Sequence, residues 1–422
     1  MPKKNRILGV CGSPRARFND TAEAIKLIKV MPSYQDFYAT IYDLASRKQL
    51  SNSEALMWMA LFGAAKEGAE VDMVLLNDFY NKKGAPLLKG MEVLENKVHA
   101  SQGIVIASPV YFGDCTSSVS LFLEDYSLQD KVVGMVSVGA KRNGGQETTN
   151  IYTLMDALSK GAIIVGNGPP TSQYGGTGWA GDVGAILDDN FGLDSSLGTG
   201  KRVMEVVKQA QLEQTGPAEL CVIASPVSKT DAIINEIEEE FAKSKVVRTS
   251  LLRISEYDIS PCLACSICPK PNENNEEYGC IIEDDMKDLD KKILNSDGLA
   301  FVIDDTPRNK DFWRYFKVFI ERTRHLRRDH FALADLPVIF FWKKDIKKNR
   351  LSWIKTATYL LRQNTFICGP LFTRSYLDGK EIYQNLSIPE ACRKFASHLC
   401  RRRHAVEQAR TKKYVYSPIG YK

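Results

Sequence analysis

The sequence has no apolar run long enough to cross a membrane. Its longest apolar runs are short ones such as residues 336–342, far below the roughly 18 residues that a membrane helix needs. The N-terminus passes from MPKK directly into the apolar segment 6–11, which leaves no room for the core of a signal peptide. We therefore expect a cytoplasmic protein without a membrane segment. In such a chain, clustered cysteines indicate metal or redox chemistry more often than disulfides.

The composition excludes a disordered or low-complexity protein. Of the 422 residues, 44% are apolar, 25% charged and 9% aromatic, so the chain can form a substantial core, and its length suits two or three domains. The formal charge of +5 is concentrated in the segment 401–422, which has seven Lys or Arg residues and one acid, Glu407. No recognised nucleic-acid-binding module accompanies this basic tail. We expect it to be solvated or to dock on a partner protein rather than bind nucleic acid.

Short apolar runs alternate with helical stretches along the first half of the chain. This alternation predicts right-handed crossovers and a parallel sheet. The predicted strands are residues 6–11, 71–76, 103–107, 131–138 and 162–166, with a helix over 54–67 between the first two.

The same order restarts near Gly216 and Pro217, so the chain resembles a divergent tandem duplication. In this second half, strands are predicted at 219–224, 245–254, 298–303 and 337–342, and helices at 231–243, 312–323 and 351–362. The predicted fold class is α/β, with two tandem three-layer domains that each contain a parallel five-stranded sheet. The expected domains are 1–214 and 215–400, followed by the tail 401–422.

Three loops in the first half follow predicted strand ends. Gly12-Ser13-Pro14-Arg15 follows the first strand, Ser108 to Gly113 follows the third, and Gly144 to Thr149 follows the fourth. Small residues with exposed backbone N–H groups at the start of a helix suit a phosphate. In a flavodoxin-type sheet the ligand binds at the carboxyl ends of strands one and three, so we expect these loops to form one site.

These loops resemble those of the NADPH-dependent FMN reductase and iron-sulfur flavoprotein family, which has a flavodoxin-like fold. The resemblance spans about residues 6–210, through the segments GSPR, SNSEAL, SPVYFG, GGQETT and DDNFGLDSSLGTGKRV. It implies that FMN is the cofactor and NAD(P)H the electron donor. The residues it implies are Ser13 and Arg15 at the FMN phosphate; Pro109, Val110, Tyr111, Phe112 and Gly113 at the edge of the isoalloxazine; and Gly144, Gly145, Gln146, Glu147 and Thr148 on its other side.

Two segments compete for the second half of the phosphate site. Asn19-Asp20-Thr21 is nearer to GSPR, but the helix that follows Asn52 and Ser53 has the length that the family shows. We favour Asn52 and Ser53, which makes residues 16–50 an insertion that caps or shapes the flavin pocket. The segment that is not used would be an ordinary helix cap.

The predicted function is an FMN-dependent NAD(P)H oxidoreductase or electron-transfer flavoprotein. No His lies at any of these loops, and a flavoenzyme does not require one, because the cofactor itself takes the hydride. Tyr111 and Phe112 either stack on the ring or the nicotinamide, or fill space at a strand end. The electron acceptor is a small molecule or a protein. Either the chain forms a homo-oligomer, or its own second half completes the flavin site in place of a neighbouring subunit. The alternative function is a non-enzymatic metal-binding or scaffold protein on a degenerate tandem flavodoxin fold.

The second half has a different set of residues at the corresponding loops. Its first turn, residues 224–231, keeps Ser-Pro but has neither the Gly nor the Arg, and Asp304 and Asp305 stand where SPVYFG would be. Two acids disfavour a phosphate, so we expect this half to bind FMN poorly or not at all. The run from Arg322 to Arg328 either attracts an NADP phosphate or an acidic partner, or is a solvated basic helix face.

Four cysteines in the second half have a spacing typical of metal ligands. They are Cys262, Cys265, Cys268 and Cys280, followed by the acidic segment Asp284-Asp285-Met286. By the same resemblance, iron-sulfur flavoproteins have such a block at this place. Three interpretations stay open: a [4Fe–4S] cluster, a four-thiolate zinc site, and free or redox-active thiols. The other six cysteines are isolated, and we expect them to be core or surface residues.

Overall fold

The chain forms two compact units, Met1–Lys208 and Gln209–Lys422, each described here by itself. The structure is a computed structural model that describes residues 4–15, 21–30, 33–81, 85–169, 171–224, 228–265, 267–268, 280–305, 312–328, 331–345, 352–378 and 380–408. Within these residues, no helix is both long and apolar enough to span a membrane.

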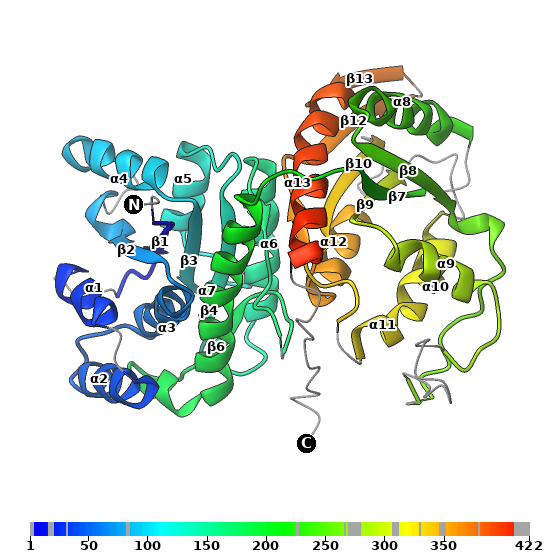
Figure 1. Ribbon diagram of the computed structural model, residues 1–422. Helices are drawn as coiled ribbons and strands as arrows, with labels where there is room; N and C mark the ends of the chain where they lie inside the picture. The colour runs from blue at the N-terminus through cyan, green and yellow to red at the C-terminus, as the bar shows by residue number, and fades with distance from the viewer. Residues whose placement is uncertain are drawn as a thin grey trace. The chain divides into compact units, whose positions relative to one another are not determined.

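The first unit has a parallel sheet with the strand order β2-β1-β3-β4-β5 (Figure 1). This is the order 2-1-3-4-5 of a flavodoxin-type doubly wound fold, and its strands are almost wholly buried, as expected when helices cover both faces. The strands are β1 (Arg6–Cys11), β2 (Glu70–Leu75), β3 (Gly103–Pro109), β4 (Val132–Gly139), β5 (Ile163–Ile164) and β6 (Gly176–Trp179).

The core of the first unit is built around α3, in which every residue from 53 to 65 is buried. Phe37 of α2 stacks on Phe62 of α3 with ring centroids 4.1 Å apart. The segment 16–50, which the sequence analysis treats as an insertion, contains α1 and α2. The helices are α1 (Thr21–Lys29), α2 (Tyr34–Ser46), α3 (Asn52–Lys66), α4 (Leu88–Ala100), α5 (Ser117–Asp125), α6 (Gln146–Ser159) and α7 (Asn190–Ala210), with the short 3-10 helices η1 (Leu76–Asp78) and η2 (Ala185–Asp188).

The second unit repeats this strand order as β8-β7-β9-β10-β11, with parallel pairing. Its strands are β7 (Ala218–Ala224), β8 (Val247–Arg253), β9 (Gly298–Asp304), β10 (Pro337–Asp345), β11 (Phe366–Cys368), β12 (Phe372–Leu377) and β13 (Lys380–Gln384). Its helices are α8 (Ser228–Ser244), the 3-10 helix η3 (Ile254–Glu256), α9 (Met286–Leu294), α10 (Phe312–Arg322), α11 (Arg324–Arg328), α12 (Ser352–Arg362) and α13 (Ile388–Gln408).

The expectation of simple five-stranded parallel sheets is wrong in one respect, which is the fifth strand. In the first unit, β4 pairs at its start with β5 and at its end with β6, so the fifth strand is interrupted. In the second unit, β10 pairs in the same way with β11 and then β12, and β13 adds an antiparallel strand. The intervening loops interrupt the apolar pattern, which is why the sequence predicts only one short fifth strand in the first half and none in the second.

Candidate functional site

The loop after β1 is shaped by side chains from two other segments. Thr116 Oγ1 donates a hydrogen bond to the Gly12 carbonyl oxygen at 2.9 Å, and Asn77 Nδ2 donates to the Ser13 carbonyl oxygen at 2.8 Å. A Cβ atom on Gly12 would lie 2.7 Å from Thr116 Oγ1, so no larger residue fits. Ser13 is buried and Arg15 is exposed. The loop therefore has a fixed backbone and an accessible cation. The sequence analysis did not identify the two residues that fix the backbone, Asn77 and Thr116.

The N-terminus of α3 has a capping box, which confirms the predicted start of this helix. Ser51 Oγ accepts the Glu54 N–H, and the Glu54 carboxylate accepts the Ser51 N–H. Asn52, in contrast, is used by another loop: its Nδ2 donates to the Asp182 carbonyl at 2.8 Å and its Oδ1 accepts the Gly184 N–H at 2.9 Å. The hydrogen-bonding groups of Asn52 are thus engaged within the protein, and its contact with a phosphate stays a prediction.

The two competing segments for the phosphate site differ in what the structure describes. Ser53, the second residue of α3, is buried. Asn19 and Asp20 of the alternative segment lie outside the described residues, and Thr21 is the first residue of α1.

The loop after β3 is a tight turn that presents two aromatic rings to solvent. Tyr111 and Asp114 exchange backbone hydrogen bonds of 2.9 and 3.0 Å, and Phe112 and Gly113 between them have φ of 54° and 83°. Positive φ at both central residues is the signature of a type I′ turn. Tyr111 is 47% exposed and Phe112 is fully exposed. These rings do not fill space at the strand end, which leaves them available for stacking.

The loop before α6 touches this aromatic turn. Gly145 has φ of 97°, and a Cβ atom on it would lie 3.0 Å from Gly113 Cα and 3.3 Å from Val110 Cγ1. On the other side, Thr148 Cγ2 lies 4.0 Å from the place of a Cβ on Gly113. Glycine at both positions therefore brings the segments SPVYFG and GGQETT into direct contact, as the sequence predicts.

Gln146 holds the shape of its own loop. Its Oε1 accepts the Gly144 N–H at 2.8 Å, and its Nε2 donates to the carbonyl oxygens of Lys141 at 2.7 Å and Gly178 at 3.0 Å. The side chain is 3% exposed, whereas Glu147 next to it is exposed. The Gln146 amide is thus occupied by loop contacts, and the sequence did not indicate this role.

A further aromatic residue lies at the same edge of the sheet. Trp179 ends β6 opposite Gly139 of β4 and is 40% exposed. The Arg142 guanidinium lies 5.9 Å from the Trp179 ring and pairs with the buried Asp189 at 2.5 Å. The sequence analysis missed Trp179. The fifth strand is interrupted, so the sequence does not show that β6 extends to the carboxyl edge of the sheet.

The four clustered cysteines lie between η3 and α9 in the second unit. All four are unpaired and partly exposed, in contrast to the six isolated cysteines, which are all buried. Burial raises the pKa of the Cys221 thiol to about 12, and the same cause raises that of Cys392 to about 12, so these thiols stay protonated and unreactive. Residues 266 and 269–279 of the cysteine segment lie outside the described residues.

The four sulfurs are close enough to affect one another. Burial raises the pKa of Cys268, and the negative charges of Cys280, Cys265 and Cys262 raise it further, while Arg328 opposes them. Among the residues described, no three His, Cys, Asp or Glu side chains converge as a single metal ion would require. A [4Fe–4S] cluster, a zinc site and free thiols therefore stay predictions for these four cysteines.

The switch point of the second unit is occupied by its own side chains. Asp304 and Asp305 are buried, and Asp305 accepts hydrogen bonds from Trp342 Nε1 at 2.9 Å and Ser352 Oγ at 2.6 Å. The sequence analysis expects these two acids to disfavour a phosphate at this place. Asp305 is directed at internal donors, and weak or absent FMN binding by this half stays a prediction. Residues 225–227, where the first loop would be, lie outside the described part of the chain.

Comparison with known proteins identifies relatives of the first unit. The sequence profile of the NADPH-dependent FMN reductase family matches residues 5–170. An iron-sulfur flavoprotein of Methanocaldococcus jannaschii is 34% identical over 175 residues, which is 91% of that protein and 37% of this chain. The chain belongs to the iron-sulfur flavoprotein family. The iron-sulfur flavoprotein of Methanosarcina thermophila is 29% identical over 189 residues, covering 93% of that protein and 39% of this chain.

Solved structures are similar at lower identity. A flavone reductase is 16% identical, with 51% of this chain and 68% of that chain covered and a TM-score of 0.32. A flavodoxin, WrbA-like protein from Agrobacterium tumefaciens is also 16% identical, with 49% of this chain and 99% of that chain covered and a TM-score of 0.30. The assignment to the iron-sulfur flavoprotein family therefore depends on the sequence matches. The flavodoxin-like fold of the first unit is shown by the order of the strands in its sheet.

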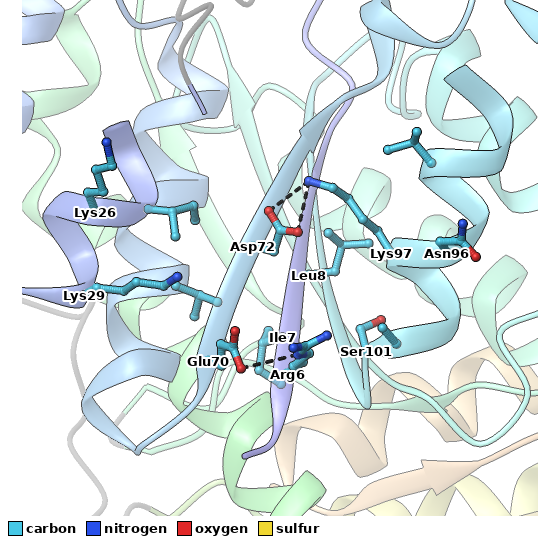
Figure 2. Close-up of a pocket in the computed structure, with 14 residues that line it drawn as sticks. Arg6, Ile7, Leu8, Lys26, Lys29, Glu70, Asp72, Asn96, Lys97 and Ser101 are labelled. Atoms are coloured by element: carbon cyan, nitrogen blue, oxygen red, sulfur yellow. Dashed lines mark hydrogen bonds and ion pairs between the residues drawn. The ribbon is translucent and has the colours of Figure 1, made fainter. Parts of the chain in front are cut away.

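A cleft of about 730 Å³ lies in the first unit, away from the residues of the candidate site. Figure 2 shows the residues that line it. It is lined by the first residues of β1 and β2 and by α1 and α4. Its charges largely pair with each other, Arg6 with Glu70 at 3.3 Å and Lys97 with Asp72 at 2.9 Å. Because the amino ends of the strands form this cleft, it is separate from the candidate flavin site at the carboxyl ends.

Proposed function

We propose that this protein is an FMN-dependent NAD(P)H oxidoreductase or electron-transfer flavoprotein, with FMN bound in the first unit. The observation that carries the proposal is that three loops at the carboxyl edge of one sheet meet. Thr116, which follows β3, bonds to Gly12, which follows β1, and Gly145 packs on Gly113. In a doubly wound sheet this edge is the ligand site.

The residues present fit FMN. Arg15 is exposed beside the fixed Ser13 loop and can form charge-assisted hydrogen bonds with a phosphate. Tyr111 and Phe112 are exposed where the isoalloxazine or the nicotinamide would stack, and Trp179 adds a third ring at the same edge. Bound FMN supplies the acceptor for a hydride from NAD(P)H, while the protein positions the two rings.

The second part of the proposal is a [4Fe–4S] cluster in the second unit, on Cys262, Cys265, Cys268 and Cys280. It is supported by the spacing of the four cysteines, which are all unpaired and partly exposed, and by the relatives, whose names describe iron-sulfur flavoproteins. A cluster transfers single electrons, so the acceptor would be a small molecule or protein that takes electrons from it. We further propose that the two units arose by duplication, because both have the order 2-1-3-4-5 and an interrupted fifth strand.

The flavin proposal is tested on anaerobically purified protein. We expect a flavin absorbance spectrum with about one FMN per chain, and bleaching of that spectrum when NADH or NADPH is added. Colourless protein that does not take up added FMN would refute the flavin proposal. Flavin that is bound but not reduced by either nucleotide would favour an electron carrier that receives its electrons elsewhere.

The cluster proposal is tested with the Cys265→Ser variant. Loss of one thiolate should abolish bound iron and sulfide, while the FMN content stays near that of the wild type, because the ligands lie in separate units. Cys221→Ala is the control, since this buried cysteine of β7 lies outside the cysteine segment and its loss should leave the iron content unchanged. Zinc, or no metal, in wild-type protein prepared without oxygen would reject the cluster.

A further inference from the structure

The segment that contains the four cysteines is closed at its two ends by the acids Asp284 and Asp285. The Ser260 N–H donates to Asp284 Oδ2 at 2.9 Å, and the Asp258 N–H donates to Asp285 Oδ2 at 2.7 Å. In return, the Asp285 N–H donates to the Asp258 carbonyl oxygen at 3.3 Å. These bonds join residues just before Cys262 to residues just after Cys280. We call this junction the neck of the cysteine segment.

Arg322, the last residue of α10, inserts into this neck. Its Nη1 lies 2.5 Å from Asp284 Oδ2 and its Nη2 lies 3.0 Å from Asp284 Oδ1, so the carboxylate is held bidentately. Nη1 also donates to the Ser260 carbonyl oxygen at 2.9 Å. One guanidinium therefore binds both sides of the neck, a geometry that its planar set of donors allows and an ammonium group does not.

The basic run that contains Arg322 is thus not a solvated helix face. Arg322 is 2% exposed and His325 is 1% exposed. His325 Nδ1 lies 2.6 Å from the Arg322 carbonyl oxygen, and its Nε2 lies 2.7 Å from Asp290 Oδ2 on α9. These contacts fix the end of α10 to α9, so the Arg322 side chain extends from a rigid base.

We propose that Arg322 is a positioning residue that joins residues 258–260 to residues 284–285 before iron arrives. This inference rests on the proposed function only for the identity of the metal group, since the neck is formed by hydrogen bonds within the chain. Its consequence is that these residues are held near one another before a cluster binds, which reduces the conformational entropy that is lost on binding.

The test measures amide hydrogen exchange in the metal-free protein. In the Arg322→Lys variant, which keeps the charge, we expect the peptides around Asp258–Ser260 and Asp284–Asp285 to exchange about tenfold faster or more than in the wild type. Arg324→Lys is the matched control: Arg324 lies two residues further on and has no ion pair with any residue that the structure describes. Exchange at the neck that is unchanged by Arg322→Lys would overturn the proposal.

Two further measurements separate the possible failures. In protein loaded with iron and sulfide, Arg322→Lys should lose iron to a chelator faster than Arg324→Lys does. If the wild type binds no iron, the cluster fails but the exchange experiment still decides the role of Arg322. If Arg322→Lys also loosens β7 and β9, Asp285→Ala, which removes the acceptor of the Asp258 N–H, replaces it. That variant should speed exchange at Asp258, and no change there would contradict the proposed neck.

Discussion

Gln146 and Arg15 belong to two loops of the candidate flavin site, and the protein uses their polar groups differently. The amide of Gln146 is buried and bonded to three backbone groups, whereas the Arg15 side chain is exposed. A ligand phosphate can bind Arg15 without breaking a bond within the protein. Gln146 would have to give up loop contacts, so its contribution is to the shape of the loop.

Replacement of Gly145 by alanine should weaken FMN binding. The residue has φ of 97° and a Cβ there would be 3.0 Å from Gly113 Cα, so the loop must move away from the aromatic turn. We expect about a tenfold higher Kd for FMN, measured by fluorescence titration of the flavin-free protein. Gly181→Ala is the control, because a Cβ at that position has no neighbour within 4 Å. Equal affinities in the two variants would contradict the proposed contact.

Asp284 should make the second unit sensitive to acid. Burial alone would raise its pKa, but the hydrogen bonds from Arg322 and from the Ser260 and Met286 N–H groups lower it below the usual range. Because the folded state has the lower pKa, its stabilisation is complete above about pH 4 and is lost as the pH falls further. Urea unfolding between about pH 5 and pH 2 should show a weaker loss of stability with acid in Asp284→Asn. If the unfolding free energies of the variant and the wild type fell equally with decreasing pH, the predicted role of Asp284 would be refuted.

At the scale of secondary-structure elements, α3 and α7 pack so closely that their backbones touch. A Cβ atom on Gly200 of α7 would be 1.6 Å from the Ala60 carbonyl oxygen, and one on Gly63 of α3 would be 2.1 Å from the Leu197 carbonyl oxygen. Neither neighbour is a side chain that can turn aside. This contact fixes α3, whose N-terminus lies after the phosphate loop, and so couples helix packing to the site.

The Gly200→Ala substitution should therefore destabilise the first unit strongly. Overpacking against a backbone atom costs about 3 kcal/mol or more of unfolding free energy, because the helices have to separate. Thermal unfolding followed by circular dichroism would measure it. Lys201→Ala, at the next and exposed position of the same helix, loses only a surface ion pair of 3.7 Å with Glu67 and should change stability by less than about 1 kcal/mol. Similar melting temperatures for both variants would be inconsistent with close packing.

At the scale of the whole molecule, the two units have the same strand order and different chemistry at the carboxyl edge. The first unit presents there a loop held by Asn77, which we propose binds the FMN phosphate, and exposed aromatic rings. The second unit buries Asp305 against Trp342 and Ser352, and has its clustered thiols elsewhere, between η3 and α9. This division is the reason to expect one flavin in a chain with two doubly wound units.

Flavin content should consequently depend on the first unit alone. Changing Ser13 and Arg15 together to alanine removes the proposed charge-assisted contact with the phosphate, which should lower FMN affinity by about 30-fold to several thousand-fold and empty the protein of flavin. Changing Ser225 and Lys229 in the second unit should leave the flavin content at the wild-type level. Two FMN per chain, or flavin that stays bound after Ser13 and Arg15 are changed, would show that the flavin site has been assigned to the wrong unit.

The sequence by itself determined the features that depend on neighbouring residues. Alternating apolar runs predict β1 to β5 in the first unit and β7 to β10 in the second, and helical spacing over 54–67 predicts most of α3. The three glycine-containing loops after β1, β3 and β4 are also visible in the sequence. Because parallel strands place their carboxyl ends at one edge, the sequence predicts that these loops meet.

Only the tertiary structure decided which polar side chains are used inside the protein. Arg322 and Asp284 are 38 residues apart, and Asp305 and Ser352 are 47 apart, so no local pattern distinguishes them from surface charges. The interruption of each fifth strand was equally hidden, since it is defined by pairing with β4 or β10. Periodicity and turn chemistry act over a few residues, whereas burial and pairing depend on which distant elements the fold brings together.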